Sequence, residues 1–198
     1  MTRRPNNEAR ARILRAAYEL FAAEGYEAAS MDRVAEAAGL KKANLFHYYR
    51  TKEALGAAVI AEAAGRHAEG MRALFADQTQ DPVTTVRQLF DRGTSGMRTD
   101  CGRGCFIGKM GQEIDESNAA MRRQLSACLG EWRAEVAEYL DGWRKRGYFR
   151  SGFKADEAAD GVLALYEGGI LIAKVVADEA ALDNARRAAV TVILWWKK

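Results

Sequence analysis

Polar side chains gather between residues 42 and 47, in a stretch whose spacing predicts a short helix. A lysine ammonium can donate to guanine, an asparagine amide can pair with adenine, and an alanine methyl can contact thymine. A histidine ring can also hydrogen-bond, although a lone histidine at a helix end is as readily a satisfied structural residue. The residues of this stretch whose types suit contact with DNA bases are Lys42, Ala43, Asn44 and His47.

A second group of residues is suited to phosphate. Ser30 and Lys52 fall at predicted helix starts, where backbone N–H groups can face an anion, and Lys41 and Tyr48 lie at the two ends of the predicted reading helix. Phosphate contacts supply affinity and register, whereas base contacts choose the sequence. Two alternatives stay open: lysines at helix ends are commonly just solvated, and Tyr48 or Tyr49 could close a small core.

The cysteines are the other residues with reactive chemistry. Cys105 stands at an expected helix start with Arg103 and Lys109 nearby, and both features would favour a nucleophilic thiolate that reacts with electrophiles or oxidants. The alternative is that Cys105 is a small buried apolar residue, the common fate of a free cysteine. Cys101 lies four residues earlier, but the glycines between the two favour a loop.

Other chemistry is not expected. Cys101 and Cys105 have three residues between them and no predicted strand nearby, unlike a thioredoxin-like motif, and without histidine neighbours they make a poor zinc site. The two histidines, His47 and His67, belong to no catalytic or metal motif, and no phosphate-binding loop occurs. We expect no enzyme, no cofactor and no metal. A thiol-based redox protein using Cys101 and Cys105 is the alternative function.

Composition predicts a helical globular protein. The 198 residues are 48% hydrophobic, include two prolines and are rich in Ala, Leu, Glu and Arg, which favours an all-α fold. The net charge is +3 and its excess lies in the first 55 residues, too little for an unspecific architectural DNA binder. An odd cysteine count without a secretory signal predicts a cytoplasmic protein. The apolar run at 168–177, interrupted by Lys174, is too short to span a membrane.

Helical periodicity places three short helices and a connecting helix in the N-terminal part. Ser30 and Thr51 are suited to cap the second and fourth of them, while Gly25 and Gly39 are suited to end the first two. Residues 1–7 cannot bury against a core and are expected to form a basic arm. The expected helices cover residues 8–24, 31–38, 42–48 and 52–75.

The second and third of these helices, joined by a glycine turn, form a helix-turn-helix pattern. Side chains that point inward have to fix the angle at which the two helices cross, and this leaves the polar residues on the exposed side. We expect the inward residues to be Val34, Leu40, Leu45 and Phe46.

The rest of the chain also reads as helices, with a polar turn at 77–82 and a glycine-rich break at 99–104. Ser117 is suited to cap a long amphipathic helix that Gly147 ends. The expected helices cover 83–97, 106–114, the segment between Ser117 and Gly147, 155–176 and 179–196.

Residues 13–55, ILRAAYELFAAEGYEAASMDRVAEAAGLKKANLFHYYRTKEAL, resemble the N-terminal signature of TetR-family regulators. Three features carry the resemblance in order: a first helix followed by Gly25, the core VAEAAG, and LFHYY before KEAL. The segment GCFIG at 104–108 is similar to one branch of this family. Two residues depart from the family pattern, since Lys41 stands where Ser or Thr is frequent and Arg50 where Pro or Lys is.

The resemblance implies a helix-turn-helix DNA-binding domain at residues 1–52 and a larger helical ligand-binding and dimerisation domain at 53–198. It implies a transcriptional regulator, commonly a repressor, that binds double-stranded operator DNA and is released by a small-molecule effector or by reaction at a cysteine. Apolar residues at helical spacing are more often plain core than ligand contacts. The candidate ligand or sensing residues are Cys105, Met97, Phe106, Met110, Trp132, Tyr139, Trp143 and Tyr166.

The last two helices are expected to form a homodimer interface, because small residues beside large ones allow close helix packing across a two-fold axis. The alternative is that these residues serve internal packing only. The expected interface residues are Gly161, Ala164, Leu165, Gly168, Ile172, Ala189, Val192 and Trp196.

Overall fold

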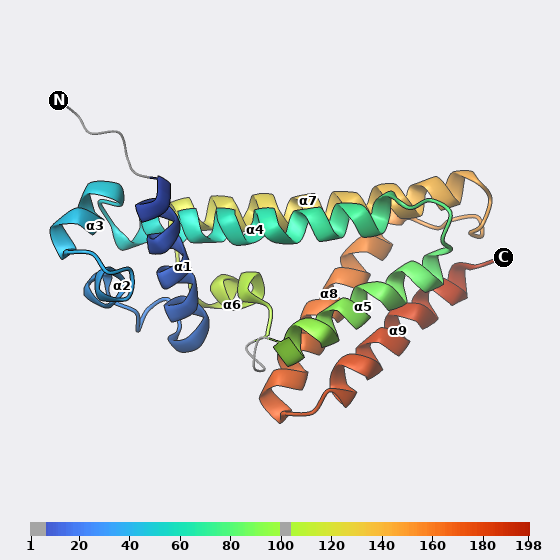
Figure 1. Ribbon diagram of the computed structural model, residues 1–198. Coiled ribbons are helices and arrows are strands. Elements are labelled where there is room, and N and C mark those ends of the chain that lie inside the picture. Colours follow the sequence, from blue (N-terminus) through green and yellow to red (C-terminus); the bar gives the residue numbers. More distant parts are fainter. Residues whose placement is uncertain (1–6, 100–103) are drawn as a thin grey trace. The chain divides into compact units, whose positions relative to one another are not determined.

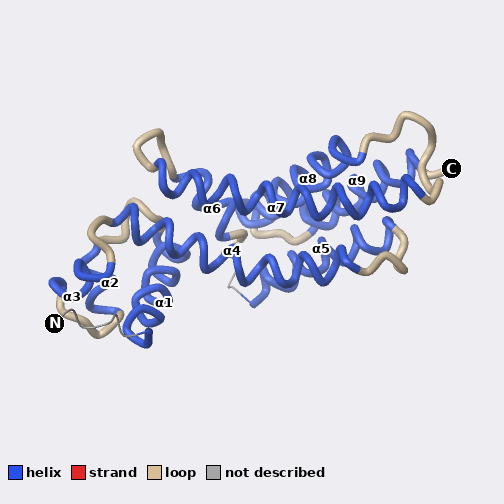
Figure 2. The backbone as a smooth tube through the Cα atoms, turned by 90° about the horizontal axis from the view of Figure 1, so that it is seen from above, coloured by secondary structure: helices blue, strands red, loops and turns tan. Residues whose placement is uncertain are grey.

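The computed structural model describes residues 7–99 and 104–198, and over these residues the predicted all-α fold is confirmed (Figure 1). Figure 2 shows the described residues as helices joined by loops and turns. Most of the predicted basic arm lies outside the described residues. The helices are α1 (Asn7–Glu24), α2 (Met31–Ala37), α3 (Lys42–Tyr48), α4 (Lys52–Ala76), α5 (Pro82–Thr99), α6 (Phe106–Glu113), α7 (Ala119–Lys145), α8 (Ala155–Val176) and α9 (Ala180–Trp196).

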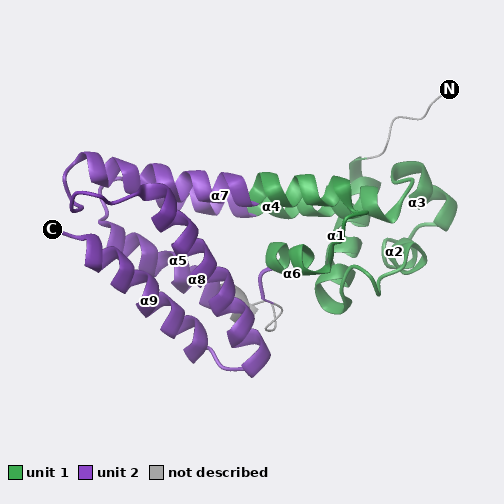
Figure 3. Ribbon diagram, turned by 180° about the vertical axis from the view of Figure 1, so that it is seen from behind, with its two compact units in different colours: residues 1–66, 106–128 green, residues 67–105, 129–198 purple. Residues whose placement is uncertain are grey.

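The chain folds as two compact units, shown in different colours in Figure 3. The first contains residues 1–66 and 106–128, and the second contains residues 67–105 and 129–198. Helix α6 and the start of α7 therefore belong to the same unit as the N-terminal helices. The predicted boundary at residue 52 separates a DNA-binding domain from a ligand-binding domain and stays a prediction. The two compact units are a different division of the chain.

The N-terminal helices form where the sequence predicts them. The buried stripe of α1 includes Ile13, Ala17 and Phe21, all with no exposed surface, at the spacing of one helix face. Gly25 follows α1 with φ of +98°, and Gly39 follows α2 with φ of +66°, backbone conformations that side chains disfavour. These glycines turn the chain sharply enough for α2 to pack against both α1 and α3.

Of the four side chains expected to fix the helix crossing, Val34 and Leu45 are buried and Leu40 is half-buried. Phe46 is 37% exposed, so its predicted inward position is wrong. The inward face of α3 is narrow: within the helix it buries Leu45 alone, Tyr49 just after the helix is also buried, and Phe46 lies about 100° round the helix from Leu45. The buried Tyr49 thus closes the core, and its hydroxyl accepts a hydrogen bond from Arg10 Nε at 3.3 Å.

Helix caps follow the predictions in two of three places. Ser30 Oγ accepts from the Arg33 N–H at 3.3 Å, and Thr51 Oγ1 accepts from the Ala54 N–H at 3.0 Å. Ser117 does not cap α7, because its hydroxyl donates to Asp115 in the preceding turn. Instead, the Ala120 N–H in the first turn of α7 donates to Glu53 Oε1 at 2.7 Å.

In the second unit α5, α8 and α9 pack against one another. Gly169 is buried where α8 approaches α9, and a Cβ there would lie 2.7 Å from the Cβ of Ala185. Gly147 ends α7 with φ of +81°, as predicted. The chain after it pairs with the C-terminus, since the Arg150 N–H donates to the Trp196 carbonyl at 2.8 Å.

Candidate nucleic-acid interface and effector site

The residues predicted to read bases lie on the exposed side of α3. This helix has seven residues and buries Leu45 alone among them, so its other side chains are available to a partner. Five polar or small side chains near its start and along its outer face are exposed, and Tyr48 at its end is half-buried. The exposed residues are Lys41, Lys42, Ala43, Asn44 and His47.

Lys42 is held by an acidic neighbour on α2. Its Nζ lies 2.7 Å from Asp32 Oδ1, and both side chains are about three-fifths exposed (60% and 62%). An exposed ion pair of this kind contributes about 0–1 kcal/mol. An external hydrogen-bond acceptor can therefore replace Asp32 at small cost.

Lys52 has a more definite place at the start of α4. Its Nζ donates to the Glu27 carbonyl at 3.0 Å and lies 4.4 Å above the centre of the Tyr26 ring. An ammonium has three N–H donors, so this arrangement orients the group and leaves donors for a phosphate. Burial, with the neighbouring Glu27 and Glu53 charges, raises the pKa of Tyr26 to about 12, so this tyrosine is neutral beneath the lysine.

The predicted effector residues do not all share one unit. Phe106 and Met110 are buried in α6 of the first unit, where the Phe106 ring lies 4.5 Å from that of Tyr18. The side chain of Met97 lies outside the described part of the chain, as does Cys101. The other four aromatic candidates belong to the second unit.

Two of these aromatic residues take part in a polar cluster at the end of α7. Tyr139 is buried, and its hydroxyl contacts the Thr85 hydroxyl at 2.8 Å and donates to the Gln80 carbonyl. Trp143 stacks edge-on against Tyr148 at 5.3 Å. Tyr139 therefore has the place of a core residue, the alternative that the sequence left open, whereas Trp143 is half-buried and its assignment stays a prediction.

Cys105 and Tyr166 lie together with a residue that sequence reasoning missed, Glu167 of α8. Cys105 is half-exposed, and its thiol shares a hydrogen bond with the Glu167 carboxyl group. Burial raises the pKa of Glu167, and its Oε1 is buried with no hydrogen-bond partner among the described residues. A single acid beside the apolar run Gly168–Ala173 is the sequence signal that could have found it.

One of the two cations expected beside Cys105, Lys109, has another partner. Lys109 Nζ donates to the Ala22 carbonyl at 2.8 Å, within the first unit, and Arg103 lies outside the described residues. The polar neighbour seen at the thiol is thus an acid.

Replacing Glu167 by Gln is expected to stabilise the protein at neutral pH. Because the pKa of Glu167 is raised above its ordinary 4.5 in the folded state, the unfolded chain loses this proton first as pH rises, and folding stability falls through that range. The amide carries no such penalty. Thermal unfolding should show a higher midpoint for Glu167→Gln at about pH 7.5 and a smaller difference near pH 4, whereas exposed Glu131→Gln should show neither. A lower midpoint for Glu167→Gln at pH 7.5 would contradict this.

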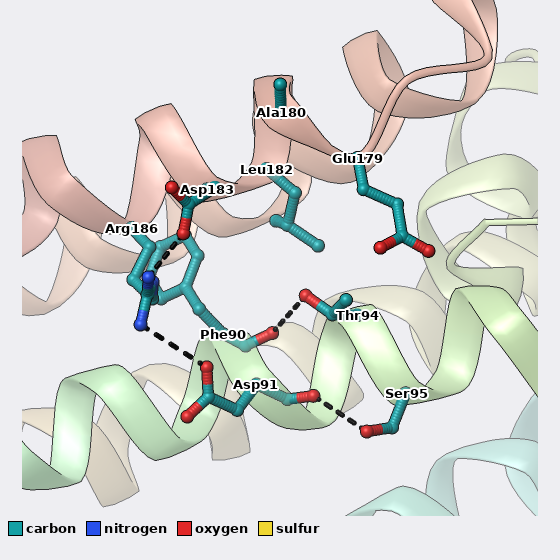
Figure 4. A pocket seen from close by; sticks show the side chains of 9 residues that line it. All are labelled: Phe90, Asp91, Thr94, Ser95, Glu179, Ala180, Leu182, Asp183 and Arg186. Carbon is teal, nitrogen blue, oxygen red and sulfur yellow. Dashed lines mark hydrogen bonds and ion pairs between the residues drawn. The ribbon is translucent and has the colours of Figure 1, made fainter.

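A groove of about 430 Å³ lies between α5 and the start of α9 (Figure 4). Arg186 lies in it between Asp91, at 3.5 Å, and Asp183, while the Thr94 and Ser95 hydroxyls donate to carbonyls of their own helix. Glu179 also lines the groove, so three acids there face one arginine. None of the predicted effector residues whose side chains are described lines the groove.

Comparison with known proteins assigns the chain to a family. A profile of the bacterial regulatory proteins of the tetR family matches residues 13–59, and a tetracyclin repressor-like C-terminal domain matches residues 82–189. The second match alone covers more than half of the chain. The chain belongs to the TetR family. The signature found in the sequence at 13–55 is thereby confirmed, and the chain is a transcriptional regulator of this family.

Curated relatives and solved structures agree with the assignment. The transcriptional regulator AcuR of Cereibacter sphaeroides is 27% identical over 82% of this chain and 75% of its own length. The transcriptional repressor DhaR of a Mycobacterium species is 23% identical over 84% and 82%. A TetR regulator from Chloroflexus aurantiacus, with 26% identity and a TM-score of 0.80 over 96% of both chains, shares the fold, as does reduced Escherichia coli NemR at 19% and 0.81 over 92% and 95%.

Two further findings concern other functions. No helix among the described residues is long and apolar enough to cross a membrane. The named relatives are regulators, which does not favour the alternative of a thiol-based redox protein.

Proposed function

We propose that this TetR-family regulator is a repressor that binds operator DNA through α3 and releases it when an effector acts on the second unit. The observation that carries the proposal is the exposed face of α3, where donors suited to base edges lie beside cations suited to phosphate. Because its target is chromosomal DNA, the protein would work in the cytoplasm.

The proposal assigns two kinds of DNA contact, to base edges and to phosphates. Helix α3 enters the major groove and reads base edges through Lys42, Ala43, Asn44 and His47, which are exposed. Phosphates are held from both sides of α3. The proposed phosphate contacts are Ser30, Lys41, Tyr48 and Lys52.

The protein would bind DNA as a dimer with two helix-turn-helix units (the reading heads), because one helix-turn-helix contacts too few base pairs for strong specificity. An apolar surface on α8 and α9 is suited to pair two copies. Ile172 is 55% exposed and Trp195 is 70% exposed. Other exposed apolar residues of the two helices are Leu171, Val175, Val176, Val192 and Leu194.

The residues expected at the dimer interface differ in how exposed they are. Ile172 and Val192 are exposed as a dimer contact requires. Ala189 has no exposed surface, so its side chain serves the internal core, whereas Trp196 is half-buried with its ring centre 5.9 Å from that of Phe153. A Cβ at Gly161 or Gly168 would meet no atom within 4 Å, which leaves room there for a facing helix.

The effector site we propose centres on Cys105, Tyr166 and Glu167. An unpaired buried oxygen is costly, and a ligand that hydrogen-bonds Glu167 would relieve that cost. Reaction at the adjacent thiol is the second way in which the site could respond. Either event would move the paired heads away from the spacing of successive major grooves, roughly 34–36 Å.

A gel-shift assay against the DNA upstream of its own gene tests the function. Binding that survives competitor DNA and raised salt supports a specific regulator. Binding that competitor DNA abolishes would indicate an unspecific binder, and no binding would overturn the proposal.

Replacing Cys105 by Ser is expected to abolish any release of operator by a maleimide. The reason is that, of the two cysteines in the described part of the chain, Cys105 is half-exposed whereas Cys128 is buried. A gel-shift titration with N-ethylmaleimide measures the release, and Cys128→Ser is the matched control that should respond like the wild type. An undiminished response in Cys105→Ser would refute sensing at this thiol.

A further inference from the structure

Helix α6 reaches the turn between α1 and α2, both within the first unit (Figure 3). The carboxyl group of Glu113, at the end of α6, accepts hydrogen bonds from the backbone N–H groups of Tyr26 and Glu27, the second at 3.4 Å. Lys109, one turn earlier, donates to the Ala22 carbonyl at the end of α1 at 2.8 Å. One face of α6 thus holds both sides of the turn.

The turn is shaped to receive this carboxyl group. Gly25 has φ of +98°, and a Cβ there would lie 2.9 Å from Glu113 Oε2 and 3.0 Å from Oε1. The glycine therefore permits both the backbone conformation and the close approach of the carboxylate. Hydrogen bonds from backbone N–H groups to a carboxylate are among the stronger ones in proteins.

The same turn holds Lys52. Glu27 takes part in both contacts: its backbone N–H donates to Glu113, and its carbonyl accepts from Lys52 Nζ at 3.0 Å. The Tyr26 ring, whose own N–H is bonded to Glu113, lies beneath the same ammonium at 4.4 Å. A continuous chain of contacts therefore runs from Glu113 through residues 26–27 to Lys52.

We infer that Glu113 is a positioning residue for operator binding, which acts through the turn at 25–27 to aim Lys52 at a DNA phosphate without touching DNA itself. This inference rests on the proposed function, since it takes Lys52 as a phosphate contact. It adds a residue of α6, far from the reading helix in sequence, to the determinants of affinity.

The test compares Glu113→Ala, Glu113→Gln and Lys52→Ala by operator affinity over a range of salt. Losing one phosphate contact lowers the slope of log affinity against log salt by about 0.9 for each protomer. We expect this decrease in Lys52→Ala and in Glu113→Ala, and no further loss when the two changes are combined. Glu113→Gln keeps an acceptor for the N–H groups and should retain most of the binding.

Exposed Glu116 provides the matched control, because Glu116→Ala removes the same charge three residues away and should leave the slope unchanged. An unchanged slope in Glu113→Ala, or losses that add in the double variant, would overturn the inference. If Glu113→Ala does not fold, Glu113→Asp, which withdraws the carboxylate by one methylene, is read in the same way. A wild-type protein that binds no operator would refute the proposed function instead.

Discussion

An Asn44→Ala variant is expected to bind its operator about 10 to 100 times more weakly than the wild type for each half-site that loses the contact. Asn44 is exposed on α3, and a bidentate pair between an asparagine amide and adenine contributes about 1–3 kcal/mol of discrimination. Because the contact is made to a base, binding to unrelated DNA should change little. Fluorescence anisotropy with operator and with scrambled duplexes measures both quantities.

Gln124→Ala is a suitable control, because it removes a similar amide from an exposed position on α7. It should leave both affinities unchanged. Equal losses on operator and scrambled DNA in Asn44→Ala would instead show that Asn44 contributes to general affinity, and the assignment of base readers would be wrong.

A double replacement, Ile172→Glu with Trp195→Glu, is expected to convert the protein to a monomer and to lower operator affinity by more than 100-fold. Both residues are more than half exposed, so the change costs little in the isolated chain. In a dimer it would place unpaired charges in an apolar contact, and truncated or unpaired groups at such sites commonly cost about 2 kcal/mol or more each. Light scattering after gel filtration gives the mass, and a gel-shift assay gives the affinity.

Leu129→Glu is the control for this experiment, since Leu129 is 42% exposed on α7, away from α8 and α9 in the sequence. It should remain a dimer. A double variant that keeps the dimer mass would show that two copies pair through another surface.

The sequence predicts the helices well because each signal is local. Gly25, Gly39, Ser30 and Thr51 act within a few residues of their own positions, and the structure confirms all four. The outward turn of Phe46 was missed because Leu45 and Phe46 are both apolar neighbours, and the sequence does not show how wide the buried face of this short helix is. Periodicity over seven residues is too short to choose between them.

The candidate site was less predictable because its parts meet only through the fold. Ser117 has the residue type of a cap, yet the distant Glu53 supplies the acceptor for the first turn of α7. Glu167 and Glu113 stand in sequence like ordinary helical acids. Their roles arise from a thiol and a turn that lie 62 and 87 residues away, counting to Cys105 and Tyr26.

The make-up of the first compact unit bears on recombination between regulators. Exchanging only residues 1–52 would transfer the helix-turn-helix without α6. The α1–α2 turn would then lose its contacts with Glu113 and Lys109, which belong to residues 106–128. A chimaera that retains the native geometry would have to exchange both stretches together. The transferable module in this protein is therefore discontinuous in the gene.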